Sequence, residues 1–152
     1  MQTPPPFDIK ARHNARKHLV QAIYEWQLTQ EEYHEIERQF LNEFLGARVE
    51  IPYFQSVLRE IILHSNNIDS AFLPYAARKL QDIDLVELAV LRLACFELLF
   101  RIDIPYQVVL NEALELTKVF GTQEGFRFVN GILDKVAQDS RQQEFKYYKK
   151  PL

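Results

Sequence analysis

The sequence predicts an all-α protein, and three observations lead to this prediction. Apolar residues recur at steps of three and four along several segments, which is the period of a helix with one buried face. Only 4 glycines occur among the 152 residues. No segment alternates apolar and polar side chains for long, so a sheet protein is disfavoured.

Four helices are expected in the N-terminal half. Residues 1–9 include three consecutive prolines and should form a flexible lead-in to the first helix. A second helix is expected to start at Thr29, whose hydroxyl could cap it, and to end at Gly46. Pro52 suits the first turn of a third helix, and a short fourth helix should cover about Ile68–Leu73.

Three further helices are expected in the C-terminal half, which makes about seven in all. Asp84 can cap a long central helix whose sequence, LVELAVLRLACFELLF, is apolar on nearly all sides. Thr122 opens the last helix, in which we expect Gly131 to permit close helix packing. The final stretch, 141–152, is polar and basic and is expected to be a flexible tail.

The charge distribution is more informative than the net charge of −3, which by itself argues against a generic nucleic-acid binder. Residues 21–60 carry three Arg against eight Glu, a balance of −5, and the last twelve residues carry a balance of +3. Residues 1–20 also carry a balance of +3, because Asp8 is their only acidic residue and four residues are basic: Lys10, Arg12, Arg16 and Lys17.

Several classes of protein are disfavoured by the sequence. The single cysteine, Cys95, rules out a disulfide framework within the chain and fits a reducing compartment. Neither a signal-peptide core nor a run of about 18 apolar residues occurs, so we expect a cytoplasmic protein without a membrane span. The four histidines lack metal-ligand spacing, and no phosphate-binding loop or nucleophile elbow is present. We therefore expect neither an enzyme nor a cofactor.

Two groups of residues are candidates for binding. Arg12 and Arg16 lie four positions apart on one helical face, where their charge opposes the helix dipole. Such a cluster can bind phosphates, or it can be a solvated leader segment. Phe126 and Phe128 flank Arg127, so at least one ring could be exposed beside a cation and stack on an unpaired base. Both rings could instead pack into the core on opposite sides of the helix.

The chain closely resembles the NusB family of bacterial antitermination factors over roughly residues 10–140. The segments that carry the resemblance are ARKHLVQAIYEWQLT, LRLACFELLFRIDIPYQVVLNEALELTKVFG and RFVNGILDKVA. The resemblance implies a helical fold of two small bundles packed together. It also implies binding to boxA, a single-stranded element of ribosomal RNA leader transcripts, together with the ribosomal protein NusE. The assembled complex would keep RNA polymerase from terminating.

The resemblance assigns RNA contacts in both halves of the chain. The arginine-rich stretch of the family falls on ARHNAR, where Arg12 and Arg16 match but His13 and Asn14 depart from the family pattern. Lys10 and Lys17 can compensate for the lost charge.

In the second group Phe128 matches an RNA-contacting aromatic, Arg127 a basic neighbour and Glu124 a carboxylate at the RNA surface. The NusE surface is expected around Tyr75–Glu87.

Two alternatives remain open at this point. The fold implied by the resemblance is also similar to the N-terminal part of a ribosomal RNA cytosine methyltransferase. The chain, ending at Leu152, could serve as an RNA-binding module for a separate catalytic subunit. A second alternative is a homodimer that hides the RNA surface, for which the 12% aromatic content allows an apolar interface.

Overall fold

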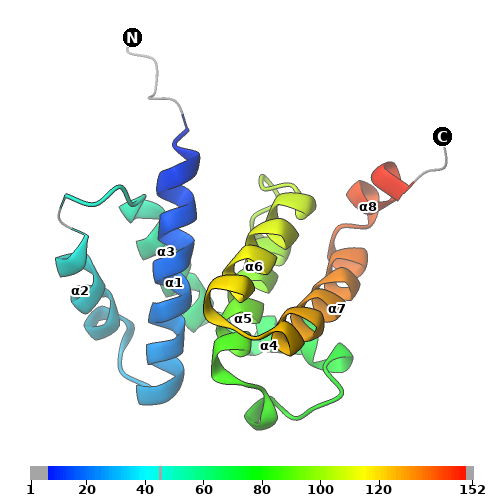
Figure 1. Cartoon of the computed structure of the whole chain (residues 1–152), viewed down its shortest axis with the longest axis horizontal. Coiled ribbons are helices and arrows are strands. Elements are labelled where there is room, and N and C mark those ends of the chain that lie inside the picture. Colours follow the sequence, from blue (N-terminus) through cyan, green and yellow to red (C-terminus); the bar gives the residue numbers. More distant parts are fainter. Residues whose placement is uncertain (1–6, 45, 150–152) are drawn as a thin grey trace. The chain divides into compact units, whose positions relative to one another are not determined.

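The computed structural model describes residues 7–44 and 46–149, and within them it contains only helices, turns and loops. Figure 1 shows these elements, with two short 3-10 segments labelled η in the text. In chain order they are α1 (Ile9–Thr29), α2 (Tyr33–Glu43), α3 (Ile51–Leu63), α4 (Ser65–Phe72), η1 (Leu73–Tyr75), η2 (Leu80–Asp82), α5 (Leu85–Phe100), α6 (Tyr106–Phe120), α7 (Gln123–Ser140) and α8 (Gln142–Lys149). The prediction of an all-α fold is confirmed, with eight α-helices in the described residues instead of seven.

The helices form two compact units, residues 1–59 and 60–152, and α3 runs across the boundary between them. In the first unit α1 packs against α2 (Figure 1). Its core holds three phenylalanine rings, Phe40, Phe44 and Phe54, whose centroids lie 4.9 to 6.5 Å apart. Leu19 and Ile23 of α1 are fully buried as well.

The second unit is built around α5, whose residues 88–98 are all buried. Helices α4, α6 and α7 pack against it, and α6 and α7 also pack against each other (Figure 1). One buried position of α5 is charged: Arg92 forms two hydrogen bonds of 2.9 and 2.8 Å with the carboxylate of Asp69 on α4. The pairing satisfies two charges that would be costly to bury alone.

The helix starts that depend on local side-chain caps were predicted correctly in two cases and wrongly in one. Asp84 accepts hydrogen bonds from the first turn of α5, and the Thr122 hydroxyl accepts one from Gly125 in α7. Thr29, in contrast, is the last residue of α1: Gln30 adopts a left-handed conformation and ends the helix, while the Thr29 hydroxyl donates back to the carbonyl of Glu25 and accepts from the N–H of Glu31. Helix α2 therefore begins later than expected, and it also ends before Gly46.

The close-packing role expected for Gly131 is wrong. A Cβ added at Gly131 would have no neighbour within 4 Å. The glycine of α7 that does permit a close approach is Gly125, where an added Cβ would lie 3.1 Å from Cδ of Glu87. The sequence alone could not distinguish them, because both lie in the same helix and only tertiary packing separates their surroundings.

The expectation of a flexible tail over 141–152 is also corrected for its described part, which forms α8 up to residue 149. Arg141, between α7 and α8, is only 4% exposed. Its five N–H groups donate to Glu144 and to four backbone carbonyls at the end of α5 and in the loop that follows. Residues 150–152, like residues 1–6 of the expected lead-in, lie outside the described part of the chain.

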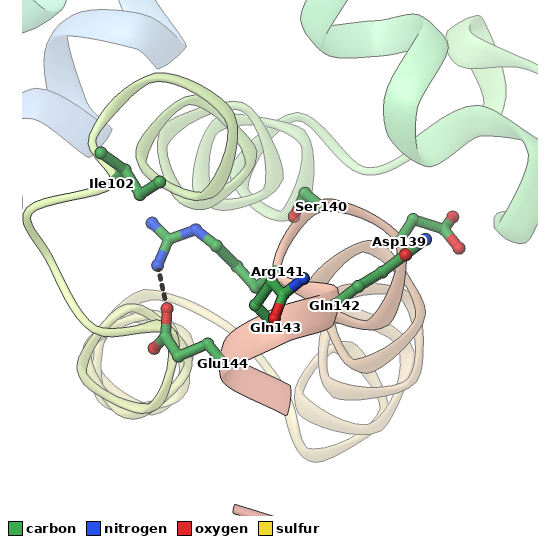
Figure 2. A pocket seen from close by; sticks show the side chains of 7 residues that line it. All are labelled: Ile102, Asp139, Ser140, Arg141, Gln142, Gln143 and Glu144. Atoms are coloured by element: carbon green, nitrogen blue, oxygen red, sulfur yellow. Dashed lines mark hydrogen bonds and ion pairs between the residues drawn. The ribbon is translucent and has the colours of Figure 1, made fainter. Parts of the chain in front are cut away.

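A pocket of about 430 Å³ lies beside this arginine and is lined by Ile102 and residues 139–144 (Figure 2). The guanidinium of Arg141 points toward Glu144 there, at 2.7 Å. The other carboxylate oxygen of Glu144 accepts from the backbone N–H of Tyr106, the first residue of α6. Arg141 and Glu144 of this pocket thus hold helix ends together.

Candidate nucleic-acid interface

The first predicted group lies on the opening turns of α1. Asp8 caps this helix by accepting a hydrogen bond of 3.0 Å from the backbone N–H of Ala11. Arg12 and Arg16 lie on one face, as their spacing predicts, and their guanidinium carbons are 4.1 and 5.8 Å from the ring centroid of Tyr53 in α3. Lys10 is exposed to solvent. The structure therefore brings the two arginines of this group together around one aromatic ring.

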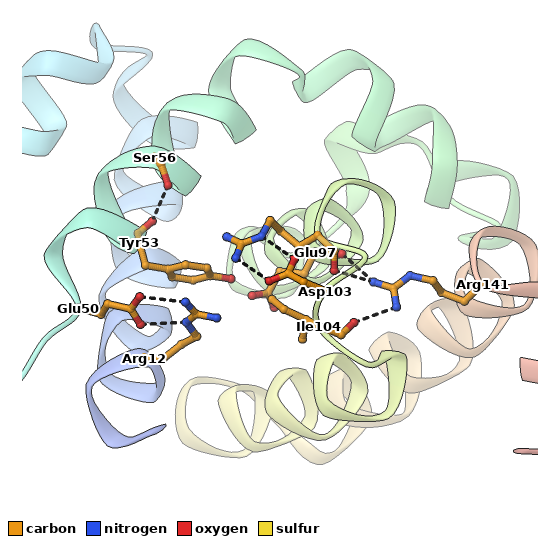
Figure 3. Close-up of polar contacts among 9 residues, drawn as sticks. Arg12, Glu50, Tyr53, Ser56, Glu97, Asp103, Ile104 and Arg141 are labelled. Atoms are coloured by element: carbon orange, nitrogen blue, oxygen red, sulfur yellow. Dashed lines mark hydrogen bonds and ion pairs between the residues drawn. The ribbon is translucent and has the colours of Figure 1, made fainter. Parts of the chain in front are cut away.

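Arg12 is held in place more firmly than a residue on a solvated helix face. Its Nε and Nη2 atoms each donate a 2.9 Å hydrogen bond to the carboxylate of Glu50, next to the ring of Tyr53 (Figure 3). The Phe7 ring also lies 4.5 Å from the guanidinium. As a result the Arg12 side chain is only 14% exposed. Arg16 is 4% exposed, so neither arginine projects freely into solvent.

Sequence reasoning missed a further cation near this group, Arg48. Its Nε donates a 2.9 Å hydrogen bond to Asp8, and its side chain is 65% exposed. The same bond lowers the pKa of Asp8 below its ordinary value, because it stabilises the carboxylate. The partners are 40 positions apart, and no local pattern in the sequence could have joined them.

The second predicted group lies at the N-terminal end of α7. Glu124 and Arg127 are exposed, whereas Phe128 is half-buried. The guanidinium carbon of Arg78 lies 4.1 Å from the centroid of the Phe128 ring, a cation–π distance. Phe128 is therefore neither a core residue nor a freely exposed ring, because the guanidinium covers part of it.

Phe126 faces different neighbours. Its ring lies 5.6 Å from Nζ of Lys118, and it lines a surface depression of about 380 Å³ with Lys118 and residues 121–123. Phe126 is also half-buried. The two rings thus differ in their surroundings, and only Phe128 is stacked against an arginine.

The segment expected to bind a protein partner, Tyr75–Glu87, reaches the second group. Tyr75 is 39% exposed and its hydroxyl donates a hydrogen bond to Asp139 of α7. Glu87 packs close to Gly125, and its burial raises the pKa of its carboxyl, an effect that Asp84 and Glu124 reinforce and Arg78 opposes. Since Arg78 of this segment stacks on Phe128, the segment and the second group are in direct contact.

The described residues offer neither a metal-binding cluster nor an accessible thiol. No three His, Cys, Asp or Glu side chains gather there in a way that could hold a metal ion. The thiol of Cys95 is fully buried, and burial raises its pKa, so it is a packing residue and not a nucleophile. None of the described helices is both long and apolar enough to cross a membrane.

The fold and the two groups define an all-α protein that offers arginine and aromatic side chains at helix ends. A model of the NusB family matches residues 13–138. A transcription antitermination protein NusB of Idiomarina loihiensis is 48% identical over 131 residues, which cover 86% of this chain and 94% of its own length. The NusB protein of Vibrio cholerae is 42% identical over 145 residues, covering 86% and 93%. The chain belongs to the NusB family.

Solved structures agree with this assignment. The structure of T. maritima NusB has a TM-score of 0.77 and 30% identity, and the match covers 96% of this chain and 99% of that one. A crystal structure of the antitermination factors NusB and NusE in complex with dsRNA shares the fold, with a TM-score of 0.77 at 23% identity, covering 87% and 99%.

Proposed function

We propose that this chain is a transcription antitermination factor that binds boxA-type single-stranded RNA of ribosomal RNA leader transcripts together with the ribosomal protein NusE. The observation that carries the proposal is family membership over nearly the full length of relatives that are antitermination proteins. The proposed role is binding within an RNA polymerase antitermination complex in the cytoplasm, with no catalytic step of its own.

The chemistry of the second group supports RNA as the ligand. Single-stranded RNA is recognised chiefly by stacking its bases on aromatic side chains and by cations that follow its phosphates. Phe128 offers a half-buried ring, and the exposed Arg127 next to it offers a cation. In this proposal Phe128 stacks on a base, Arg127 contacts a phosphate, and Glu124 accepts a hydrogen bond from a base edge.

The first group offers charge. Lys10 is exposed at the start of α1, and Arg12 and Arg16 follow within two turns. Phosphate contacts of this kind add affinity without reading the base sequence. We assign this group to the RNA backbone, with the exposed Lys10 as its direct contact and the largely buried Arg12 and Arg16 adding positive charge beside it.

The contact between Arg78 and Phe128 supports a joint role for RNA and NusE. If NusE binds along Tyr75–Glu87, it binds the segment that contains Arg78, and the guanidinium of Arg78 covers the Phe128 ring. A partner that holds this segment would also fix the stacking surface, so each ligand would strengthen the binding of the other. Tyr75 and Glu87 are the contacts we propose for the partner.

The proposal is tested by fluorescence anisotropy with a labelled boxA oligomer and a scrambled oligomer of the same composition, each with and without NusE. We expect a preference for boxA and a gain of about 5- to 150-fold in affinity when NusE is present, which is the usual range of coupling between two ligands. Equal affinity for both oligomers, with and without NusE, would contradict the proposal.

A further inference from the structure

We propose that Arg48 binds RNA phosphate and, with Lys10, supplies much of the electrostatic contact of the first unit. This inference rests on the proposed RNA-binding function and assigns that function a residue outside the arginine-rich stretch. Arg12 and Arg16 are 14% and 4% exposed, yet a phosphate contact requires a guanidinium that the RNA backbone can reach.

Residues 47–50, which we call the strap, run along the first turns of α1. The backbone N–H of Glu50 donates a 3.1 Å hydrogen bond to the carbonyl of Ala11. The side-chain amide of Asn14 donates a 2.9 Å hydrogen bond to the carbonyl of Arg48. These bonds fix the position of Arg48 relative to α1. Asn14, one of the two departures in ARHNAR, therefore has a structural role: it anchors Arg48, a further arginine, at this end of the helix.

Arg48 differs from Arg12 in how much of its guanidinium is available. Arg12 uses two N–H groups on Glu50 and lies against Tyr53, which leaves 14% of its side chain exposed. The Arg48 side chain is 65% exposed, and its Nε is paired with the exposed side of α1 through Asp8, whose side chain is 41% exposed. An incoming phosphate can therefore reach Arg48 without displacing any buried group.

The bond between Arg48 and Asp8 does not prevent Arg48 from binding a phosphate. Ion pairs between exposed side chains contribute little to stability, because water and salt screen them. A phosphate offers the guanidinium the same paired-oxygen geometry as a carboxylate. RNA could thus replace Asp8 as the partner of Arg48, while the strap keeps the backbone of residue 48 in place.

The test compares Arg48→Ala with Arg38→Ala in the full-length protein, using the boxA oligomer at several salt concentrations. Arg38 is a matched control, because it belongs to the same unit, is 71% exposed and also pairs with an exposed carboxylate, Glu35. Loss of one phosphate contact on a single strand should flatten the slope of log affinity against log salt by about 0.7. If both proteins bind the oligomer equally at 1 M salt, this difference in slope makes the variant bind roughly 5-fold more weakly than the unaltered protein at 0.1 M salt. Arg38→Ala should leave both quantities unchanged, and Arg48→Lys should retain the wild-type slope.

Asp8→Asn provides a second, opposite perturbation. Asparagine caps a helix as well as aspartate does, so α1 should be preserved while the charge that competes for Arg48 is removed. We expect Asp8→Asn to strengthen RNA binding, and to do so less in a protein that already carries Arg48→Ala.

Three results would overturn the inference. Wild-type affinity and slope in Arg48→Ala, with boxA preference intact in the unaltered protein, would refute this assignment alone. An equal loss in Arg38→Ala would show that any surface charge has the same effect. Absence of RNA binding by the unaltered protein would overturn the proposed function and this inference with it.

Discussion

Replacing Phe128 with alanine separates two roles that the structure combines in one residue. The ring is half-buried, and the guanidinium of Arg78 covers it at 4.1 Å. Truncation removes a stacking surface for RNA and also a packing contact within the second unit. The two losses can be measured separately.

The stability loss can be bounded from these contacts. A fully buried phenylalanine costs roughly 3–5 kcal/mol when cut to alanine. A partly exposed cation–π contact contributes about 0.5–1 kcal/mol. For the half-buried Phe128 we expect the free energy of unfolding to fall by about 1–2 kcal/mol, the cation–π loss plus part of the burial. Loss of one stacked base should weaken RNA binding by about 1–3 kcal/mol, which is roughly 5- to 150-fold.

The assay pairs urea unfolding with RNA anisotropy on three variants. Phe128→Leu keeps most of the apolar volume but removes the aromatic face, so it should lose RNA affinity while retaining most of the stability. Phe126→Ala is the control for a half-buried ring on the same helix, and it should leave boxA binding unchanged. The reasoning fails if Phe128→Leu binds RNA as tightly as the unaltered protein, because the ring would then act by packing alone.

Three further predictions follow from the fold. Gly131→Ala should raise the free energy of unfolding by about 1 kcal/mol, because nothing lies within 4 Å of the added Cβ and alanine favours helix; a lower urea midpoint would contradict this. Arg141→Ala should lower it by about 3 kcal/mol or more, since four backbone carbonyls lose the guanidinium as a donor, although those of Glu97 and Arg101 keep a backbone N–H, and Arg141→Lys should rescue little; unfolding curves that match the unaltered protein would show that the network is dispensable. Because burial raises the pKa of Glu87, its stabilising contribution is complete below the ordinary pKa of 4.5 and is lost as pH rises through the raised value. Glu87→Gln should therefore gain more stability over the unaltered protein at pH 7 than at pH 4, and an equal gain at both would refute the assignment.

Local signals in the sequence predicted much of the fold. Helical periodicity and the caps at Asp84 and Thr122 depend on residues within one turn, and the structure contains both caps. Thr29 misled the prediction because its hydroxyl both donates back to the carbonyl of Glu25 and accepts from the N–H of Glu31, while the chain leaves the helix at Gln30 in a left-handed conformation. The helix after Arg141 was missed because Arg141 is anchored by carbonyls about 40 positions away.

The candidate interface shows the same division between local and distant information. The shared face of Arg12 and Arg16 follows from their spacing, and the structure places both beside Tyr53. How far these arginines are buried depends on partners such as Glu50, which is 38 positions from Arg12. The stacking of Arg78 on Phe128 and the bond from Arg48 to Asp8 likewise join distant parts of the chain, and no periodicity or motif in the sequence indicates them.

The central claim, that this chain is an antitermination factor, is tested most directly by transcription through a terminator placed downstream of a boxA leader. The assay uses RNA polymerase with a complete set of antitermination components, including NusE, and omits or adds only this protein. We predict that adding it raises the fraction of transcripts that pass the terminator, and that a scrambled boxA abolishes the increase. An unchanged fraction of terminated transcripts, with the intact boxA and all other components present, would contradict the claim.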